Sequence, residues 1–144
     1  MASELLKYSN IKEFVPYSVE RANVENKNGL FRKENICVSK NFLSSGEEII
    51  TLERLLKQKY ETTFEKETKG KPIKEAISDI VKLVEESTGI QNYGANLTQL
   101  LEFDAFILNE DRHSQNIAFI YNNGVYKPSP VFDNGGAFLP EIIL

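Results

Sequence analysis

Residues 96–126 read NLTQLLEFDAFILNEDRHSQNIAFIYNNGVY and place an apolar helical pattern, a polar loop and a hairpin signal next to one another. Apolar residues in 97–108 cover most of a helix circumference, which predicts a central, buried helix. The sequence NLTQ at 96–99 resembles a capping box and would begin this helix. Beyond the polar loop, residues 117–126 form a predicted hairpin, because the NNG turn sequence favours positive φ angles.

A pair of strands is predicted upstream of this region. Segments 14–20 and 34–42 are rich in β-branched and aromatic residues. The sequence NKNG at 26–29 lies between them and is a turn signal. We therefore expect the two segments to pair as neighbouring strands.

Two further helices are predicted between the strands and residue 96. A capping box that begins at Ser45 predicts an amphipathic helix reaching Tyr60. Residues 61–71 carry charges of both signs and no periodic apolar face, which favours a solvated loop over a basic recognition patch. Helical spacing of apolar residues resumes after Pro72 and stops at Gly89.

Composition excludes several classes of protein. The chain has 144 residues, 41% hydrophobic and 26% charged, which is typical of one globular domain. Its net charge of −4 lacks the broad positive field of nucleic-acid-binding proteins, so no direct nucleic-acid binding is expected. One cysteine, Cys37, and one histidine, His113, build neither a disulfide nor a four-ligand zinc site, and Cys37 is interpreted as a small core residue.

No membrane or export signal is found in the sequence. The first residues carry charges where a signal peptide needs an apolar run. The longest unbroken apolar stretch, residues 117–121, is far shorter than a membrane span. We therefore expect a cytoplasmic protein with no membrane partner.

Three polar side chains flank the hairpin predicted at 117–126. Asp111 and Asn116 precede it, and Asp133 follows it beside glycines that let a ligand approach the backbone. Because a hairpin returns the chain to its start, these residues can converge on one pocket. A carboxylate and an amide suit Mg²⁺, which takes further ligands from water and phosphates. The remaining carboxylate, Asp111, is placed to accept a proton from a hydroxyl nucleophile, as phosphoryl transfer requires.

These motifs resemble a known kinase family. The DRHxxN sequence at 111–116, followed by FDNG at 132–135, resembles the catalytic loop and metal-binding turn of HipA-like serine/threonine kinases, the toxin kinases of bacterial toxin–antitoxin systems. The helix end FDAFILN at 103–109 is similar as well. The aspartate-to-asparagine spacing also equals that of the general kinase pattern H-R-D-L-x-x-x-N. The resemblance covers roughly residues 100–138.

The resemblance implies an α+β, protein-kinase-like fold: a mainly helical C-lobe with a short N-terminal β-hairpin and a catalytic-loop hairpin. It implies that Asp111 is the catalytic base and that Asn116 and Asp133 bind ATP through Mg²⁺. His113 is either a second catalytic residue or, as for most single histidines, a residue that holds the loop in shape. The implied partners are a protein substrate with a serine or threonine hydroxyl and an antitoxin or complementary kinase chain.

Parts of a complete kinase are missing from the pattern. A complete kinase has a glycine-rich loop, a strand lysine and a partner glutamate before its catalytic loop, and this set is not found before Asp111. Lys40 follows a predicted strand, but no glycine-rich hairpin precedes it. The sequence ends on the apolar run LPEIIL at 139–144. We therefore expect residues 1–144 to be a single but partial kinase domain, with little activity alone.

Other interpretations stay open. The chain could be a non-catalytic, kinase-like binding module or a half-kinase that completes a partner chain. Phosphatidylinositol 3- and 4-kinases share the DRHxxN loop, but they usually follow it with a full DFG sequence instead of the DNG found at 133–135. Asp111 could also be a surface residue paired with Arg112. Ser114 has no surroundings that would make it a hydrolase nucleophile.

Overall fold

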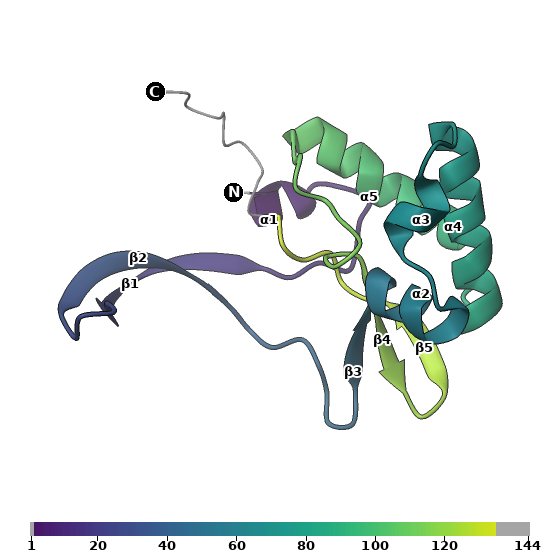
Figure 1. Cartoon of the computed structure of the whole chain (residues 1–144). Helices are drawn as coiled ribbons and strands as arrows, with labels where there is room; N and C mark the ends of the chain where they lie inside the picture. Colours follow the sequence, from purple (N-terminus) through teal and green to yellow (C-terminus); the bar gives the residue numbers. More distant parts are fainter. Residues whose placement is uncertain (1, 135–144) are drawn as a thin grey trace.

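The computed structural model describes residues 2–134, and within this range the chain forms five helices and two small antiparallel sheets (Figure 1). The fold class is α+β, as predicted. Gly135 and Gly136, which the sequence places beside the candidate site, and the apolar run at 139–144 lie outside the described residues.

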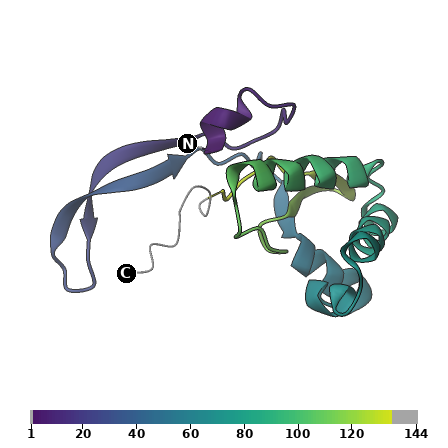
Figure 2. The same ribbon diagram turned by 90° about the horizontal axis from the view of Figure 1, so that it is seen from above.

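The first sheet is a two-stranded ribbon of β1 (Tyr17–Glu25) and β2 (Phe31–Ser39), paired over their whole length. It projects from the body of the molecule (Figures 1 and 2). The predicted strand pair is confirmed, although its strands begin and end at different residues. Cys37 is exposed on the ribbon, so its assignment to the core is wrong. The pattern misled because the β-branched neighbours form a ribbon that, among residues 2–134, no other layer covers.

The second sheet has the strand order β3 (Glu48–Thr51), β4 (Ala118–Asn122) and β5 (Val125–Pro128). The β4–β5 hairpin confirms the prediction for 117–126. Asn123 and Gly124 both have positive φ angles, 47° and 88°, as the favoured two-residue hairpin turn requires.

Strand β3 corrects the predicted start of the first long helix. Residues 48–51 pair with β4. The proposed cap at Ser45 is wrong, because the Glu47 carboxylate accepts a hydrogen bond from the Ser44 N–H (2.8 Å) in a turn before the strand. Helix α2 (Leu52–Tyr60) begins after Thr51, whose hydroxyl accepts from the Arg54 N–H at 3.2 Å.

The next helices confirm one prediction and correct another. Helix α4 (Ile73–Thr88) begins after Pro72 and ends at Gly89, which has a φ of 73°, as predicted. The expected loop at 61–71 contains a short helix, α3 (Phe64–Thr68), capped by Thr63. Phe64 packs against the core and gives this segment an apolar anchor that a periodicity search cannot detect in five residues.

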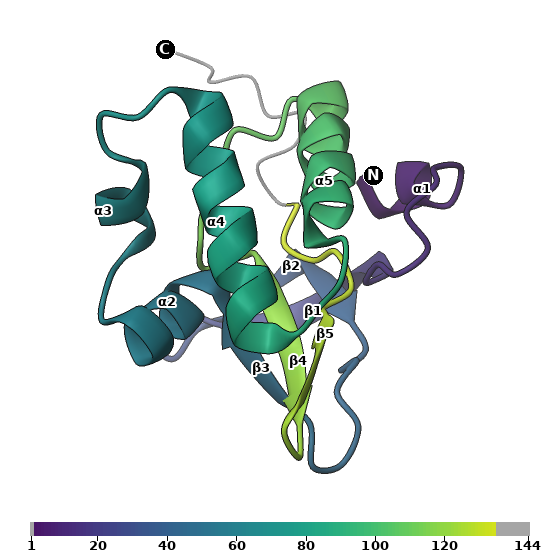
Figure 3. The same cartoon turned by 90° about the vertical axis from the view of Figure 1, so that its right-hand side faces the viewer.

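Helix α5 (Tyr93–Ile107) starts before the predicted capping box at 96–99, so that box does not cap it. The helix is also less central than predicted, since Phe106 is 73% exposed and Leu108, just beyond its end, is 71% exposed. Its buried face still meets the β3–β5 sheet and α1 (Ala2–Leu6), as Figure 3 shows.

Two apolar clusters hold the body together. The larger joins α2, α4 and α5 to the sheet, and Phe119 of β4 is fully buried at its centre. The smaller packs Leu6 of α1 against Phe103 and Ile107 of α5. Burying each such side chain stabilises the fold by about 1.5–3 kcal/mol. None of the helices within residues 2–134 has the length and apolarity to cross a membrane.

Candidate functional site

The β4–β5 hairpin brings together two loops that carry the candidate residues. One loop links α5 to β4 and contains Asp111 and Asn116, while the other follows β5 and contains Asp133. The second loop is fixed by a parallel bridge, in which the Val15 N–H donates to the Val131 carbonyl (2.9 Å) and the Val131 N–H donates to the Glu13 carbonyl (2.8 Å). The first loop is therefore held between a helix and a strand, and the second is tied to the segment that precedes β1.

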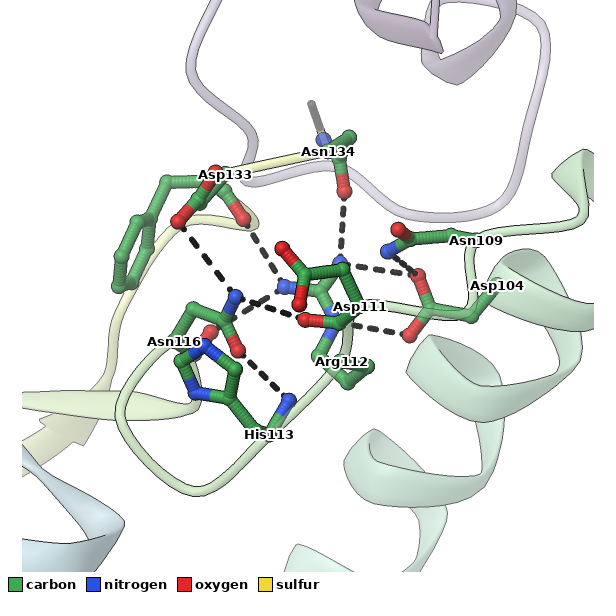
Figure 4. A network of polar contacts seen from close by, with 9 residues as sticks. Asp104, Asn109, Asp111, Arg112, His113, Asn116, Asp133 and Asn134 are labelled. Atoms are coloured by element: carbon green, nitrogen blue, oxygen red, sulfur yellow. Dashed lines mark hydrogen bonds and ion pairs between the residues drawn. The ribbon is translucent and has the colours of Figure 1, made fainter. Parts of the chain in front are cut away.

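Asn116 joins these two loops, and its side chain is buried. Its Nδ2 donates to the Asp111 carbonyl at 3.1 Å and lies 3.4 Å from Asp133 Oδ2 (Figure 4). Its Oδ1 accepts from the His113 N–H at 2.8 Å. The structure thus brings Asp111, Asn116 and Asp133 to one place. Asp111 and Asp133 themselves are exposed, so solvent and ligands reach both carboxylates.

Arg112 lies behind these residues and is the centre of a larger network. Its Nε and Nη2 donate to both carboxylate oxygens of Asp104 at 2.7 and 2.9 Å. Its Nη1 donates to the carbonyls of Phe132 (2.9 Å) and Asn116 (3.2 Å), and its Nη2 also donates to Asn134 Oδ1 at 2.6 Å. One guanidinium therefore links α5, the first loop and the second loop (Figure 4).

The Arg112–Asp104 pair is buried, with side chains only 5% and 6% exposed. The alternative in which Asp111 pairs with Arg112 on the surface is therefore wrong. A buried arginine needs a buried carboxylate and several acceptors, and here Asp104, two loop carbonyls and the Asn134 side chain provide them. This role of Arg112 was not predicted from the sequence. A signal was present, because Asp104 is a charged residue within an apolar helix and needs a buried partner. Asn109, whose Nδ2 donates to Asp104 at 2.8 Å, completes the group.

His113 helps to shape the first loop. Its Nδ1 accepts from the Gln115 N–H at 3.2 Å, and its own N–H holds the Asn116 amide. These two contacts support the interpretation that His113 holds the loop in shape. The imidazole is exposed and lies in the same loop as Asp111.

Ser114 ties the first loop to helix α2. Its hydroxyl donates to Glu53 Oε2 at 3.0 Å, and the Glu53 N–H donates back to the Ser114 carbonyl at 3.1 Å. Burial raises the pKa of the Glu53 carboxyl, but hydrogen bonds from the Phe64 N–H, Ser114 and Lys57 outweigh it and hold that pKa below its ordinary value. Glu53 is thus an ionised anchor that sequence reasoning also missed.

Tyr17 supports the second loop. Its hydroxyl accepts from the Asp133 N–H at 3.2 Å, which links the first residue of β1 to the candidate site. Asp133 has a φ of 53°, a left-handed conformation that aspartate tolerates better than most residues. The turn that presents this carboxylate is therefore held from both sides, by Tyr17 and by Arg112.

The side chains present fit a Mg²⁺ ion only in part. Within residues 2–134, no three His, Cys, Asp or Glu side chains gather closely enough to hold a metal by themselves. Asn116 and Asp133 offer an amide oxygen and a carboxylate, and Mg²⁺ commonly takes one or two protein ligands plus waters and phosphates. Asn116 Oδ1 already accepts one hydrogen bond, which leaves one lone pair. The Nδ2 of Asn116, a hydrogen-bond donor, is the atom that faces Asp133, whereas Oδ1 faces the His113 N–H, so the amide would have to turn over before both side chains offered oxygens to one Mg²⁺ ion.

A cavity of about 610 Å³ adjoins the network. Arg112 and Asn116 form part of its wall, and Ile11, Leu100 and Val131 contribute apolar surface. Its size lies in the range of small-molecule sites. A ligand in this cavity would therefore lie next to the residue that joins the two loops.

No family model, curated protein or solved structure matches this chain.

Proposed function

We propose that this chain is a HipA-like serine/threonine kinase module that transfers the γ-phosphate of ATP to a protein hydroxyl. The observation that carries the proposal is the position of Asn116. Its amide nitrogen lies 3.1 Å from the backbone carbonyl of Asp111 and 3.4 Å from the Asp133 carboxylate, so the backbone of the proposed base lies beside the side chains of both proposed metal ligands. The protein-kinase-like fold and the partial nature of the domain belong to the same proposal.

Asp111 would act on the substrate hydroxyl. Its carboxylate is exposed and sits on a loop that Asn116, Arg112 and Ser114 fix from three directions, so it can orient the hydroxyl and accept its proton. Asn116 and Asp133 would hold Mg²⁺. When bound, Mg²⁺ offsets the negative charge of the phosphates. The cavity beside Asn116 has room for the adenosine part of ATP.

The proposed roles are tested by phosphoryl transfer. The chain is incubated with ATP and Mg²⁺, alone and with cognate partner chains, and phosphate gain is followed by intact mass. Asp111→Asn should abolish transfer and leave the fold intact, because the amide cannot accept a proton. Asp79→Asn, which changes a surface aspartate on α4, is the matched control and should keep full transfer. Equal transfer by wild type and Asp111→Asn would remove Asp111 from this role.

A non-catalytic binding module is the second candidate. The observation in its favour is that the Asn116 amide is engaged by protein groups on both atoms. In addition, Lys40 is exposed and belongs to no phosphate-binding loop within the described residues. Such a module, or a half-kinase lacking its partner, would bind nucleotide without transferring phosphate. A lipid kinase would instead transfer the γ-phosphate to a phosphoinositide and leave proteins unphosphorylated.

A further inference from the structure

The ribbon of β1 and β2 ends in a basic and apolar tip. The tip, residues 25–33, contains the cations Lys27, Arg32 and Lys33 and one acidic residue, Glu25, which pairs with Phe31. It also exposes two large apolar side chains, Leu30 (61%) and Phe31 (68%). Isolated two-stranded hairpins are marginal in water, and exposed apolar groups at their ends favour a covering partner.

The end of helix α5 has the opposite charge and a matching apolar surface. Phe106 and Leu108 are exposed there, between the exposed carboxylates of Glu102 and Glu110. No lysine or arginine occurs from residue 93 to residue 111. We call Glu102, Phe106, Leu108 and Glu110 the α5 end.

The two surfaces do not meet within one molecule. The tip lies at the far end of a ribbon of nine residues per strand, and both views show it away from α5 (Figures 1 and 2). Such a strand spans about 30 Å, at 3.3 Å per residue. The ribbon therefore extends its basic tip well beyond its own body.

We infer that the ribbon is an exchange arm, whose tip binds the α5 end of a second copy of this chain. The charges of the two surfaces favour this occupant, because the tip carries three positive charges and one negative charge in a chain whose net charge is −4. The apolar side chains match as well, with Leu30 and Phe31 facing Phe106 and Leu108. Reciprocal exchange closes the assembly as a twofold dimer, whereas a one-way contact would continue into a filament.

This inference does not depend on the proposed kinase activity. A dimer without transfer, or transfer by a monomer, would separate the two proposals. If both hold, the ribbon of one copy comes close to the loop that carries Asp111 of the other.

The test is the molar mass in solution, measured by sedimentation or light scattering across a range of protein and salt concentrations. We expect a dimer that dissociates on dilution and more readily in high salt, which screens the ion pairs. Phe31→Ser should weaken the dimer at least about tenfold, as expected for a central apolar contact. Val125→Ser, at an equally exposed valine outside the ribbon, should not change it.

Charge reversal provides the sharper result. The double variant Arg32→Glu with Lys33→Glu should be monomeric, and so should Glu102→Lys with Glu110→Lys. The chain carrying all four changes should dimerise again, which misfolding cannot imitate. A wild-type monomer at all concentrations, an assembly larger than a dimer, or no recovery in the fourfold variant would overturn the inference.

The position of Cys37 permits a second measurement on the same protein. It is the single cysteine of the chain and is exposed on β2. A spin label there should give a defined distance between two labels in the dimer, and this signal should vanish on dilution. A dimer that shows no such signal, or one that persists after charge reversal of the tip, would also contradict the exchange arm.

Discussion

At the residue scale, Arg112 explains why the two loops stay together. Its guanidinium bonds to a helix carboxylate, two backbone carbonyls and the Asn134 amide, and each contact fixes a different part of the site. Lysine could not replace these contacts, because its ammonium lacks the planar fork that grips a carboxylate with two donors. The proposed chemistry at Asp111 therefore depends on a buried side chain next to it.

Loss of this side chain should destabilise the whole fold. Arg112→Met leaves Asp104 as a buried carboxylate without its cation, and we expect a loss of about 3–5 kcal/mol in the free energy of unfolding. Adding Asp104→Leu should recover part of that loss, since the buried charge is then gone. Urea unfolding measures both variants. A loss below about 1 kcal/mol in Arg112→Met would contradict the buried network.

The Glu53 anchor makes stability depend on pH. Its pKa is held below the ordinary value of 4.5, so its contribution is present at neutral pH and is lost as the pH falls through the folded-state pKa. Glu53→Gln should therefore be less stable than wild type at pH 7, by about 1 kcal/mol, and the difference should shrink at pH 3. Urea unfolding at both pH values checks this, with Glu86→Gln as the surface control. A stability difference between wild type and Glu53→Gln that grows from pH 7 to pH 3 would contradict a lowered pKa of Glu53.

At the element scale, local signals predicted the elements that local residues determine. The β4–β5 turn depends on Asn123 and Gly124, and α4 on Pro72 and Gly89, so both were found from the sequence. The start of α2 depends on a distant partner instead. Residues 48–51 join β4 as a strand, and that pairing displaced the capping box expected at Ser45.

The two possible caps of α2 give a direct comparison. Thr51→Ala removes a hydroxyl that accepts from the Arg54 N–H, and should cost about 1 kcal/mol of unfolding free energy. Ser45→Ala, at the cap expected from the sequence, should change it by less than about 0.5 kcal/mol. Thermal or urea unfolding of both variants measures the difference. A larger loss of stability in Ser45→Ala than in Thr51→Ala would contradict a helix that begins at Leu52.

At the scale of the whole molecule, the candidate site was only partly visible in the sequence. The spacing of Asp111, Asn116 and Asp133 around a hairpin predicted that they meet, because a hairpin returns the chain to its start. Glu53 and Tyr17, which support the site, could not be identified because they come from elements whose packing depends on long-range contacts, whereas Asp104 gave a signal as a charged residue within an apolar helix. The exposed ribbon was hidden for the same reason: β-branched residues mark a strand, but not what covers it.

The central claim is that Asn116 and Asp133 form a Mg²⁺-dependent nucleotide site, and calorimetric titration of ADP into the whole chain tests it most directly. Binding should require Mg²⁺ and should weaken at least about tenfold in Asp133→Ala, since one of two protein ligands is lost. Asp79→Asn should bind as wild type does. Equal ADP affinity with and without Mg²⁺, or in wild type and Asp133→Ala, would contradict the claim.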